Sequence, residues 1–118
     1  MRAIRGATCL SRDDSDEMRE VVAELLGAML ERNAVTLDEV VSVLLTSTPD
    51  LHAAFPAAGA RAAGFTDVPL ICAQEIDVTG ALPRVVRVMM HVDIDRPRAG
   101  ITHVYLRGAE VLRSDLPQ

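Results

Sequence analysis

The sequence predicts an α+β fold in which a mixed β-sheet packs against one long helix and one short helix. Apolar side chains recur at helical spacing between Met18 and Met29, whereas several shorter stretches alternate with period two or are almost continuously apolar. These stretches follow one another as strand, helix, strand, helix and three strands, an order typical of α+β or mixed-sheet domains. With 118 residues, the chain is expected to form a single domain over residues 1–118.

The first strand is predicted over residues 2–10. Period two places Arg5 on the same face as the small residues Ala3 and Ala7. An arginine that shares a face with small residues indicates a lined cavity, while its position early in the strand, taken alone, favours an exposed face. Both interpretations remain open at this point.

The long helix is predicted to begin at Asp14 or Ser15, since either side chain can cap it, and to run to about Arg32. Its methionines fall on the apolar stripe and are expected in the core. Thr36 and Glu39 have the spacing of a capping box, which predicts a short helical turn after the long helix.

The second half of the chain contains the remaining elements. Residues 40–45, VVSVLL, are expected to form a strand buried on both faces. Pro56 is expected to open a short helix that stops at Gly64. Further strands are predicted over residues 68–73, 85–94 and 102–106, and residues 111–112 are one more strand candidate after a turn at Gly108.

The basic residues of the chain are unusual because all twelve are arginine. Without lysine, neither Schiff-base chemistry nor a phosphate-loop lysine is available. Arginine instead offers permanently charged, forked donors that suit carboxylates and phosphates. A genomic codon bias also explains such a composition, at least for most of the twelve.

Composition excludes several classes of partner. A net charge of −5 and only three aromatic residues argue against a nucleic-acid surface. No apolar run approaches the roughly 20 residues that cross a bilayer, and none of signal-peptide length begins the chain. A cytoplasmic protein that needs no membrane is therefore expected, with Cys9 and Cys72 as free thiols and no zinc-type metal site.

The arginines provide the strongest candidate site. Arg87 lies within an apolar strand, where a cation needs a partner or a ligand to offset its desolvation. An ion pair with Glu75 or Glu110 and a bound anion meet this need equally well. If Arg5 and Tyr105 lie nearby, the arginine-rich pocket with one carboxylate suits a small dianion.

Two other constellations are less favoured. His91, Asp93 and Asp95 alternate and could converge on a divalent ion, but they supply one nitrogen ligand and two arginines follow, so a solvated strand end is the preferred interpretation. Cys72 could act as a nucleophile, yet a cysteine in an apolar strand is typical of packing.

Several motifs, taken together, resemble a known family. In collinear order along nearly the whole chain stand residues 5–8 (RGAT), 45–51 (LTSTPDL), 55–57 (FPA), 69–80 (PLICAQEIDVTG), 87–90 (RVMM), 103–106 (HVYL) and 111–113 (VLR). They resemble the monofunctional chorismate mutases of the trimeric α/β class, which is unrelated to the all-helical class.

This resemblance implies the Claisen rearrangement of chorismate to prephenate, in the branch leading to phenylalanine and tyrosine. It implies a homotrimer with a pseudo α/β-barrel core and active sites between neighbouring subunits. It also implies no metal, no cofactor and no covalent intermediate.

The resemblance also implies a role for each site residue. Arg87 would reach the ether oxygen, and Glu75 would accept a hydrogen bond from the ring hydroxyl. Arg5 and Tyr105 would hold the side-chain carboxylate. Cys72 would line the site near Glu75 as a hydrogen-bond donor.

The remaining implied site residues lie at the edge. Phe55 and Ala57 would form an apolar wall contributed by the adjacent subunit, and Arg61 and Arg113 would draw in the dianion at the mouth. Ala58 departs from the family, since relatives can carry lysine there, and weaker substrate capture is the expected result. How the short tail after Arg113 behaves over the site stays open.

Two rival functions remain to be weighed. A non-catalytic trimeric domain that binds a small carboxylate as a sensor would have a similar arginine pocket, but it would gain nothing from Glu75. A hydrolase or thiol enzyme would depend on Cys72, so that Cys72→Ser would abolish its turnover.

Overall fold

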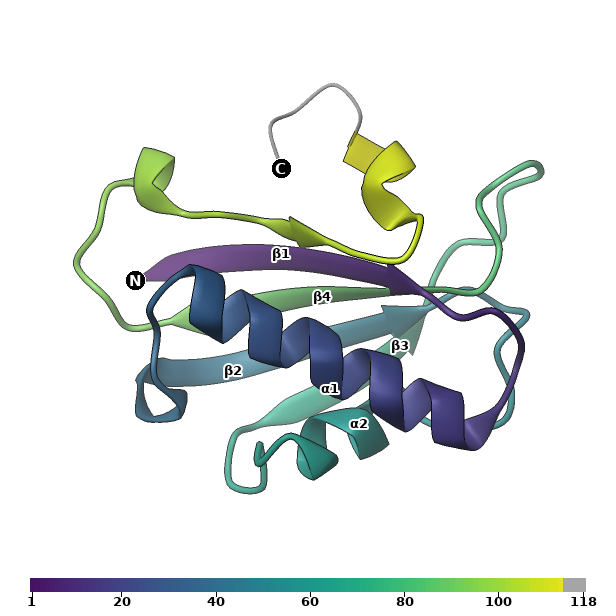
Figure 1. The fold of residues 1–118 in the computed structure, drawn as a ribbon, viewed down its shortest axis with the longest axis horizontal. Coiled ribbons are helices and arrows are strands. Elements are labelled where there is room, and N and C mark those ends of the chain that lie inside the picture. The colour runs from purple at the N-terminus through teal and green to yellow at the C-terminus, as the bar shows by residue number, and fades with distance from the viewer. Residues whose placement is uncertain (114–118) are drawn as a thin grey trace.

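A computed structural model describes residues 1–113, which form one five-stranded sheet with two helices on it (Figure 1). The strands lie in the order β3-β2-β4-β1-β5. Strand β4 is antiparallel to β1 and β2, whereas β3 and β5 run parallel to their neighbours, so the predicted α+β fold with a mixed sheet is confirmed. The elements are β1 (Arg2–Cys9), α1 (Ser15–Arg32), β2 (Val40–Ser47), α2 (Pro56–Ala62), β3 (Leu70–Gln74), β4 (Val85–Val92) and β5 (Val104–Tyr105).

Helix α1 has the predicted bounds and the predicted cap. The Asp14 carboxylate accepts a hydrogen bond from the Glu17 backbone N–H at 2.9 Å, which satisfies one donor of the first turn. The buried side chains of α1 follow one stripe against the sheet: Met18, Val21, Val22, Leu25, Leu26 and Met29. Both α1 methionines therefore belong to the core, as predicted.

Two glycines allow the layers to approach closely. A Cβ built on Gly6 of β1 would lie 2.5 Å from the sulfur of Met29 in α1. A Cβ on Gly59 of α2 would lie 2.6 Å from the Val22 Cβ. These contacts hold α1 tightly against the sheet and against α2.

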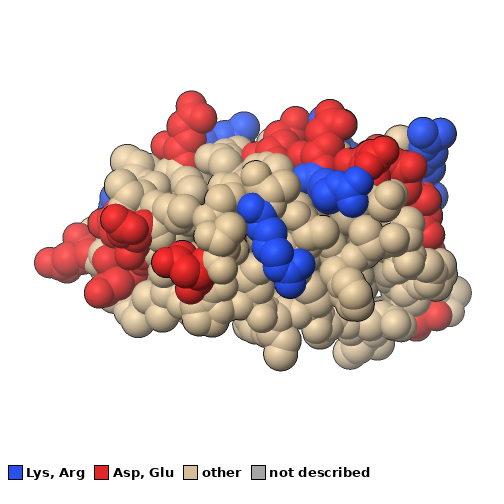
Figure 2. Space-filling view, turned by 90° about the horizontal axis from the view of Figure 1, so that it is seen from below, with Lys and Arg blue, Asp and Glu red and all other residues tan. Residues whose placement is uncertain are grey.

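Both helices cover the same face of the sheet, and no helix of residues 1–113 covers the other (Figure 1). The prediction that β2 is buried on both faces is therefore wrong for the single chain. Val43 and Leu45 point into the core, but Leu44 is 44% exposed on the open face, and Ile71 of β3 is 61% exposed. Figure 2 views the molecule from the edge that carries α2 and β3, where uncharged residues form a broad area and acidic residues gather at one end and along one side.

The C-terminal part differs from prediction at residues 111–112, which are not a strand. They belong to a 3₁₀-helix over Ala109–Arg113. Arg107 and Gly108 both have positive φ, so the backbone leaves the extended conformation just after β5. The question of how the tail beyond Arg113 behaves concerns residues that the structure does not describe.

Two strands also begin or end at residues other than those predicted. Strand β3 begins at Leu70, two residues later than predicted, because Pro69 has no N–H to donate to the ladder. Strand β4 ends at Val92, and Asp93 instead donates its backbone N–H to the Glu39 carbonyl at 2.8 Å.

No helix among residues 1–113 is long and apolar enough to cross a lipid bilayer. Cys9 and Cys72 are both free thiols. Burial, together with Glu110 nearby, raises the pKa of the Cys9 thiol above its ordinary value.

The tight contact at Gly59 predicts a stability effect. Gly59→Ala should lower the free energy of unfolding by about 1–3 kcal/mol, because its methyl group collides with Val22. Gly27→Ala is the matched control, since nothing lies within 4 Å of its built Cβ, and it should raise stability by about 0.5–1 kcal/mol. Urea unfolding measures both, and equal effects of the two substitutions would contradict the packing described here.

Candidate active site

Glu75 and Arg87 form an ion pair where β2, β3 and β4 meet on the open face of the sheet. The Arg87 Nε lies 3.2 Å from Glu75 Oε1, and the Thr46 hydroxyl donates to Glu75 Oε2 at 2.6 Å. Strand register explains the meeting, because Thr46 stands directly opposite Arg87 on β4. The Glu75 backbone N–H donates to the Ser47 carbonyl at 2.9 Å, which anchors the acid just past the end of β3.

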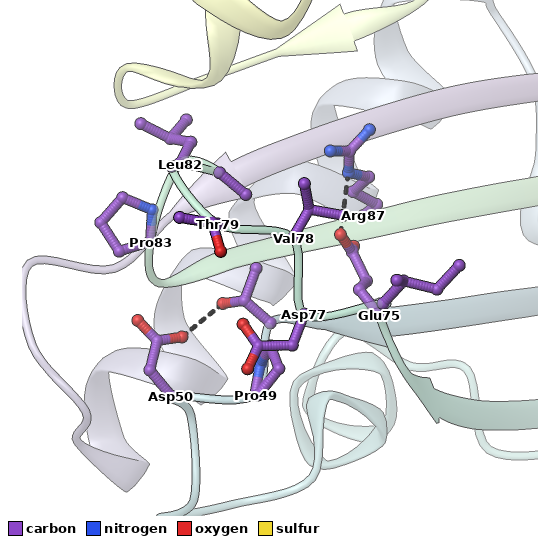
Figure 3. A pocket seen from close by; sticks show the side chains of 13 residues that line it. Pro49, Asp50, Glu75, Asp77, Val78, Thr79, Leu82, Pro83 and Arg87 are labelled. Carbon is purple, nitrogen blue, oxygen red and sulfur yellow. Dashed lines mark hydrogen bonds and ion pairs between the residues drawn. The ribbon is translucent and has the colours of Figure 1, made fainter.

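Of the two carboxylates considered as partners for Arg87, the structure selects Glu75. Glu110 instead accepts a hydrogen bond from the Gly108 backbone N–H at 3.0 Å. The Glu75 side chain is 16% exposed, but that of Arg87 is 50% exposed, because its strand face is open to solvent. The terminal guanidinium nitrogens point away from Glu75 (Figure 3).

A cavity of about 670 Å³ lies beside this pair, bordered by the loop of residues 76–83 (Figure 3). Thr48 and Asp50 fix the end of that loop. The Thr48 hydroxyl donates to Asp50 at 2.5 Å and accepts from the buried Val85 N–H at 3.0 Å. The backbone N–H of Arg84, a residue with positive φ, donates to Asp50 at 3.0 Å.

These contacts change the pKa of the Asp50 carboxyl. Its partial burial raises the pKa, but the hydrogen bonds from Thr48 and from the Arg84 N–H outweigh burial, and the pKa of Asp50 lies below its ordinary value. Asp50 therefore stays ionised and keeps the start of β4, which carries Arg87, in place.

A second cavity, of about 240 Å³, is strongly cationic and adjoins the first at Arg87. Arg5, Arg87, Arg113 and Tyr105 all line it. The Arg5 Nε is buried and has no hydrogen-bond partner among residues 1–113. A buried donor without an acceptor is costly unless a ligand supplies one. Four residues of the predicted set therefore line one cavity, and no carboxylate of residues 1–113 is among its lining residues.

The other predicted residues lie elsewhere on the chain. Cys72 packs against the core on the helix side of β3, whereas Glu75 lies with Thr46 on the open face. Cys72 and Phe55 line a separate cavity of about 290 Å³, and Phe55 is 74% exposed. Within one chain, the structure does not bring Cys72 to Glu75.

Two further residues were predicted at the edge of the site. Ala57 is only 6% exposed, so within the single chain it is part of the packing of α2. Arg61 is exposed in the last turn of α2 and lines none of the three cavities above. The predicted set thus separates into two groups. The arginine group lines the cationic cavity and consists of Arg5, Arg87, Arg113 and Tyr105. The Phe55 group lies near α2 and consists of Phe55 and Cys72.

Sequence reasoning missed the polar groups that support the site. Thr46 was noted only as part of a motif, and so were Thr48 and Asp50. Period two along β2 places Thr46 on the face of Leu44, but only the strand order reveals that Arg87 and Glu75 share this face. Among residues 1–113, no group of three or more His, Cys, Asp and Glu side chains could hold a metal ion.

Comparisons with known proteins match the chain to one family. The family model described as chorismate mutase type I matches residues 1–116. The chorismate mutase AroH of Bacillus subtilis (strain 168) is 47% identical over 98% of this chain and 92% of its own length. That of Thermus thermophilus is 44% identical over 98% of this chain and 96% of its own.

A solved structure is similar as well. The chorismate mutase from Clostridium thermocellum superposes with a TM-score of 0.92 at 47% identity, and the match covers 94% of this chain and 99% of that one.

The Thr48 hydroxyl provides a test of how the site is supported. Thr48→Val should lower the free energy of unfolding by about 1–2 kcal/mol, because it leaves the buried Val85 N–H without its acceptor. Thr79 is an exposed residue that lines the cavity of about 670 Å³ together with Thr48. Thr79→Val should therefore change the free energy of unfolding by less than about 0.5 kcal/mol. Chemical denaturation monitored by circular dichroism compares them, and an unaffected Thr48 variant would contradict the role given to its hydroxyl.

Proposed function

Since the chain belongs to the type I chorismate mutase family and is therefore an isomerase acting on chorismate, we propose that it rearranges chorismate to prephenate by means of the Arg87–Glu75 pair and the cationic cavity beside it. The observation that carries this proposal is the placement of one cation and one carboxylate 3.2 Å apart, next to a pocket lined by further arginines. This arrangement complements a reaction that separates charge.

The chemistry limits what such a site has to do. Chorismate is a flexible dicarboxylate whose rearrangement proceeds without a catalyst from a chair-like conformer. As the ether C–O bond breaks ahead of C–C bond formation, the enolpyruvyl part becomes negative and the ring becomes positive. Holding the reactive conformer and stabilising this separation are therefore the available means of catalysis.

Arg87 and Glu75 would each stabilise one of the two developing charges. The guanidinium of Arg87 would donate to the ether oxygen, where negative charge develops, and it cannot lose its proton there. The Glu75 carboxylate would accept from the ring hydroxyl and lie near the developing positive charge. The Thr46 hydroxyl, at 2.6 Å from Glu75, would hold the carboxylate in that orientation.

The cationic cavity would hold the substrate's side-chain carboxylate. Arg5 and Tyr105 both line it, and the buried Arg5 Nε lacks an acceptor within residues 1–113. Arg113, at the same cavity, and Arg61 would attract the dianion. A forked donor suits this role, because a carboxylate accepts two parallel hydrogen bonds.

The separation of the two residue groups supports a site shared between subunits. Phe55 is exposed and apolar, and Cys72 lies beside it, yet neither reaches the cavity of Arg5 and Arg87. We place the Phe55 group of one copy against the arginine group of the next. The chain would then act as one domain over residues 1–118 in a homotrimer with a pseudo α/β-barrel core.

The open face of the sheet supports the same assembly. Leu44 and Ile71 expose large apolar side chains there, and burying them against other copies would be favourable. The proposed trimer would close a barrel around this face. The proposed location is the cytoplasm, where free thiols such as Cys9 and Cys72 persist.

The sensor alternative is not favoured. The matched relatives are named as enzymes, and a receptor for a dianion would gain nothing from a carboxylate next to its cations.

The role of Arg87 gives a kinetic prediction. Arg87→Ala and Arg87→Lys should each lower kcat by about 10²–10³-fold, because neither places a guanidinium at the ether oxygen. Arg32→Ala removes an exposed arginine at the end of α1 and should leave kcat unchanged. Loss of chorismate absorbance, with prephenate identified as product, measures all three. A raised KM with normal kcat for the Arg87 variants would show that Arg87 only binds the substrate.

A shared site gives a prediction of subunit complementation. Phe55→Asp puts an anion in the apolar wall and should repel the dianion, and Arg87→Ala removes the catalytic cation, so each variant should be nearly inactive alone. Equal amounts unfolded and refolded together should recover about a quarter of wild-type activity, because a head-to-tail ring then pairs intact groups at one site in four. No recovery from mixtures that light scattering confirms as trimers would contradict sites between subunits.

A further inference from the structure

His103 contacts the strand that carries Arg5, and nothing in the proposed chemistry accounts for it. The Arg5 backbone N–H donates to His103 Nδ1 at 2.9 Å, although the two residues lie 98 positions apart. A backbone N–H can only donate, so Nδ1 must be the unprotonated acceptor. His103 is consequently the neutral tautomer with its proton on Nε2.

The segment around His103 is held on both sides. The buried Asn33 side chain accepts from the Thr102 N–H at 2.7 Å and donates to the Thr102 carbonyl at 2.8 Å. On the other side, β5 pairs in parallel with β1 over only two residues, and the Leu106 N–H donates to the Ala7 carbonyl at 2.9 Å. The imidazole therefore extends a very short strand pairing by one step.

This contact links two residues of the proposed site. Arg5 lies on β1 and Tyr105 on β5, two positions after His103, and both line the cationic cavity of about 240 Å³. Their spacing depends on how β5 is aligned with β1. A fourth cavity, of about 410 Å³, is lined by His103 and by the same Arg5.

We propose that neutral His103 is a positioning residue for catalysis. By accepting a hydrogen bond from the Arg5 backbone N–H, it sets the distance between Arg5 and Tyr105 and so determines how tightly these two residues bind the substrate's carboxylate. This inference rests on the proposed function, in which Arg5 and Tyr105 hold that group. His103 does not touch the substrate cavity in the single chain, and it acts through the backbone of its neighbour.

The surroundings of His103 disfavour its protonated form. Burial and the positive charges of Arg5 and Arg113, in that order, lower the pKa of His103 below its ordinary value. The cavity that His103 lines also contains the remaining groups able to bear positive charge: the N-terminal residue, Arg2, His91 and Arg98. No carboxylate lines this cavity.

Protonation would place an N–H of His103 against the N–H of Arg5. The hydrogen bond would be lost, and β5 would separate from β1 at that step. The stabilisation that neutral His103 provides is therefore present above the ordinary histidine pKa and is lost as pH falls through the lowered folded-state pKa.

The test compares His103→Asn, His103→Ala and the control His91→Asn between about pH 5 and pH 8. The asparagine carbonyl can replace Nδ1 as an acceptor without titrating. His91 lines the same cavity but contacts Ser42 at 3.4 Å, not the Arg5 backbone. Measured quantities are kcat, KM for chorismate and the imidazole tautomer by nitrogen NMR.

In the wild type and in His91→Asn, KM should rise as pH falls through the His103 pKa, while kcat changes less. His103→Ala should raise KM about tenfold at every pH, a change of about 1.4 kcal/mol. His103→Asn should keep a near-wild-type KM at neutral pH and lose the rise at low pH. Titration of the substrate itself is common to all the proteins and cancels in the comparison.

A wild-type KM for His103→Ala, or the same rise at low pH in His103→Asn, would overturn the inference. If His103→Ala fails to fold, the pH profile of His103→Asn still decides. Arg5→Ala separates this inference from the proposed function. An unchanged KM for Arg5→Ala would refute the binding role of Arg5, whereas a raised KM for Arg5→Ala beside an unaffected His103→Ala would refute only the role of His103.

Discussion

Helix α1 lies close against β1 at Gly6 and against α2 at Gly59, and this packing places both helices on one side of the sheet. Because successive side chains of a strand point to opposite faces of a sheet, the side chains of the other face are left uncovered by these helices. In this chain that face carries the Arg87–Glu75 pair together with exposed apolar residues such as Leu44. The location of the candidate site and the exposure of these apolar residues have the same cause.

Charge on the open face is organised by strand pairing. Thr46 holds Glu75, and Glu75 holds Arg87, because β2 lies between β3 and β4. The opposite edge is held differently, since β5 is only two residues long and depends on the His103 side chain for one more hydrogen bond to β1. Arg5 is thereby connected to the shortest strand of the described sheet.

An enzyme for this rearrangement has no need of acids, bases or metals, and a set of arginines is a fitting means. Guanidinium groups stay charged, bind carboxylates at two points and cannot be deprotonated by the substrate. The absence of lysine from the chain removes amine chemistry without removing anything that this mechanism uses. Arg5 and Arg87 line one cavity, where the proposed mechanism uses the guanidinium itself.

Local pattern was enough to predict the helix bounds, the turn at Gly108, the mixed α+β class and the face that Arg5 shares with Ala7, because hydrophobic period and capping are properties of neighbouring residues. It misassigned residues 111–112, where positive φ at Arg107 and Gly108 breaks the extension. Only the tertiary structure decided that Glu75, not Glu110, pairs with Arg87, that one face of β2 stays open, and that His103 meets the Arg5 backbone. Each of these depends on the order of strands in the sheet, which joins residues far apart along the chain and which no local period records.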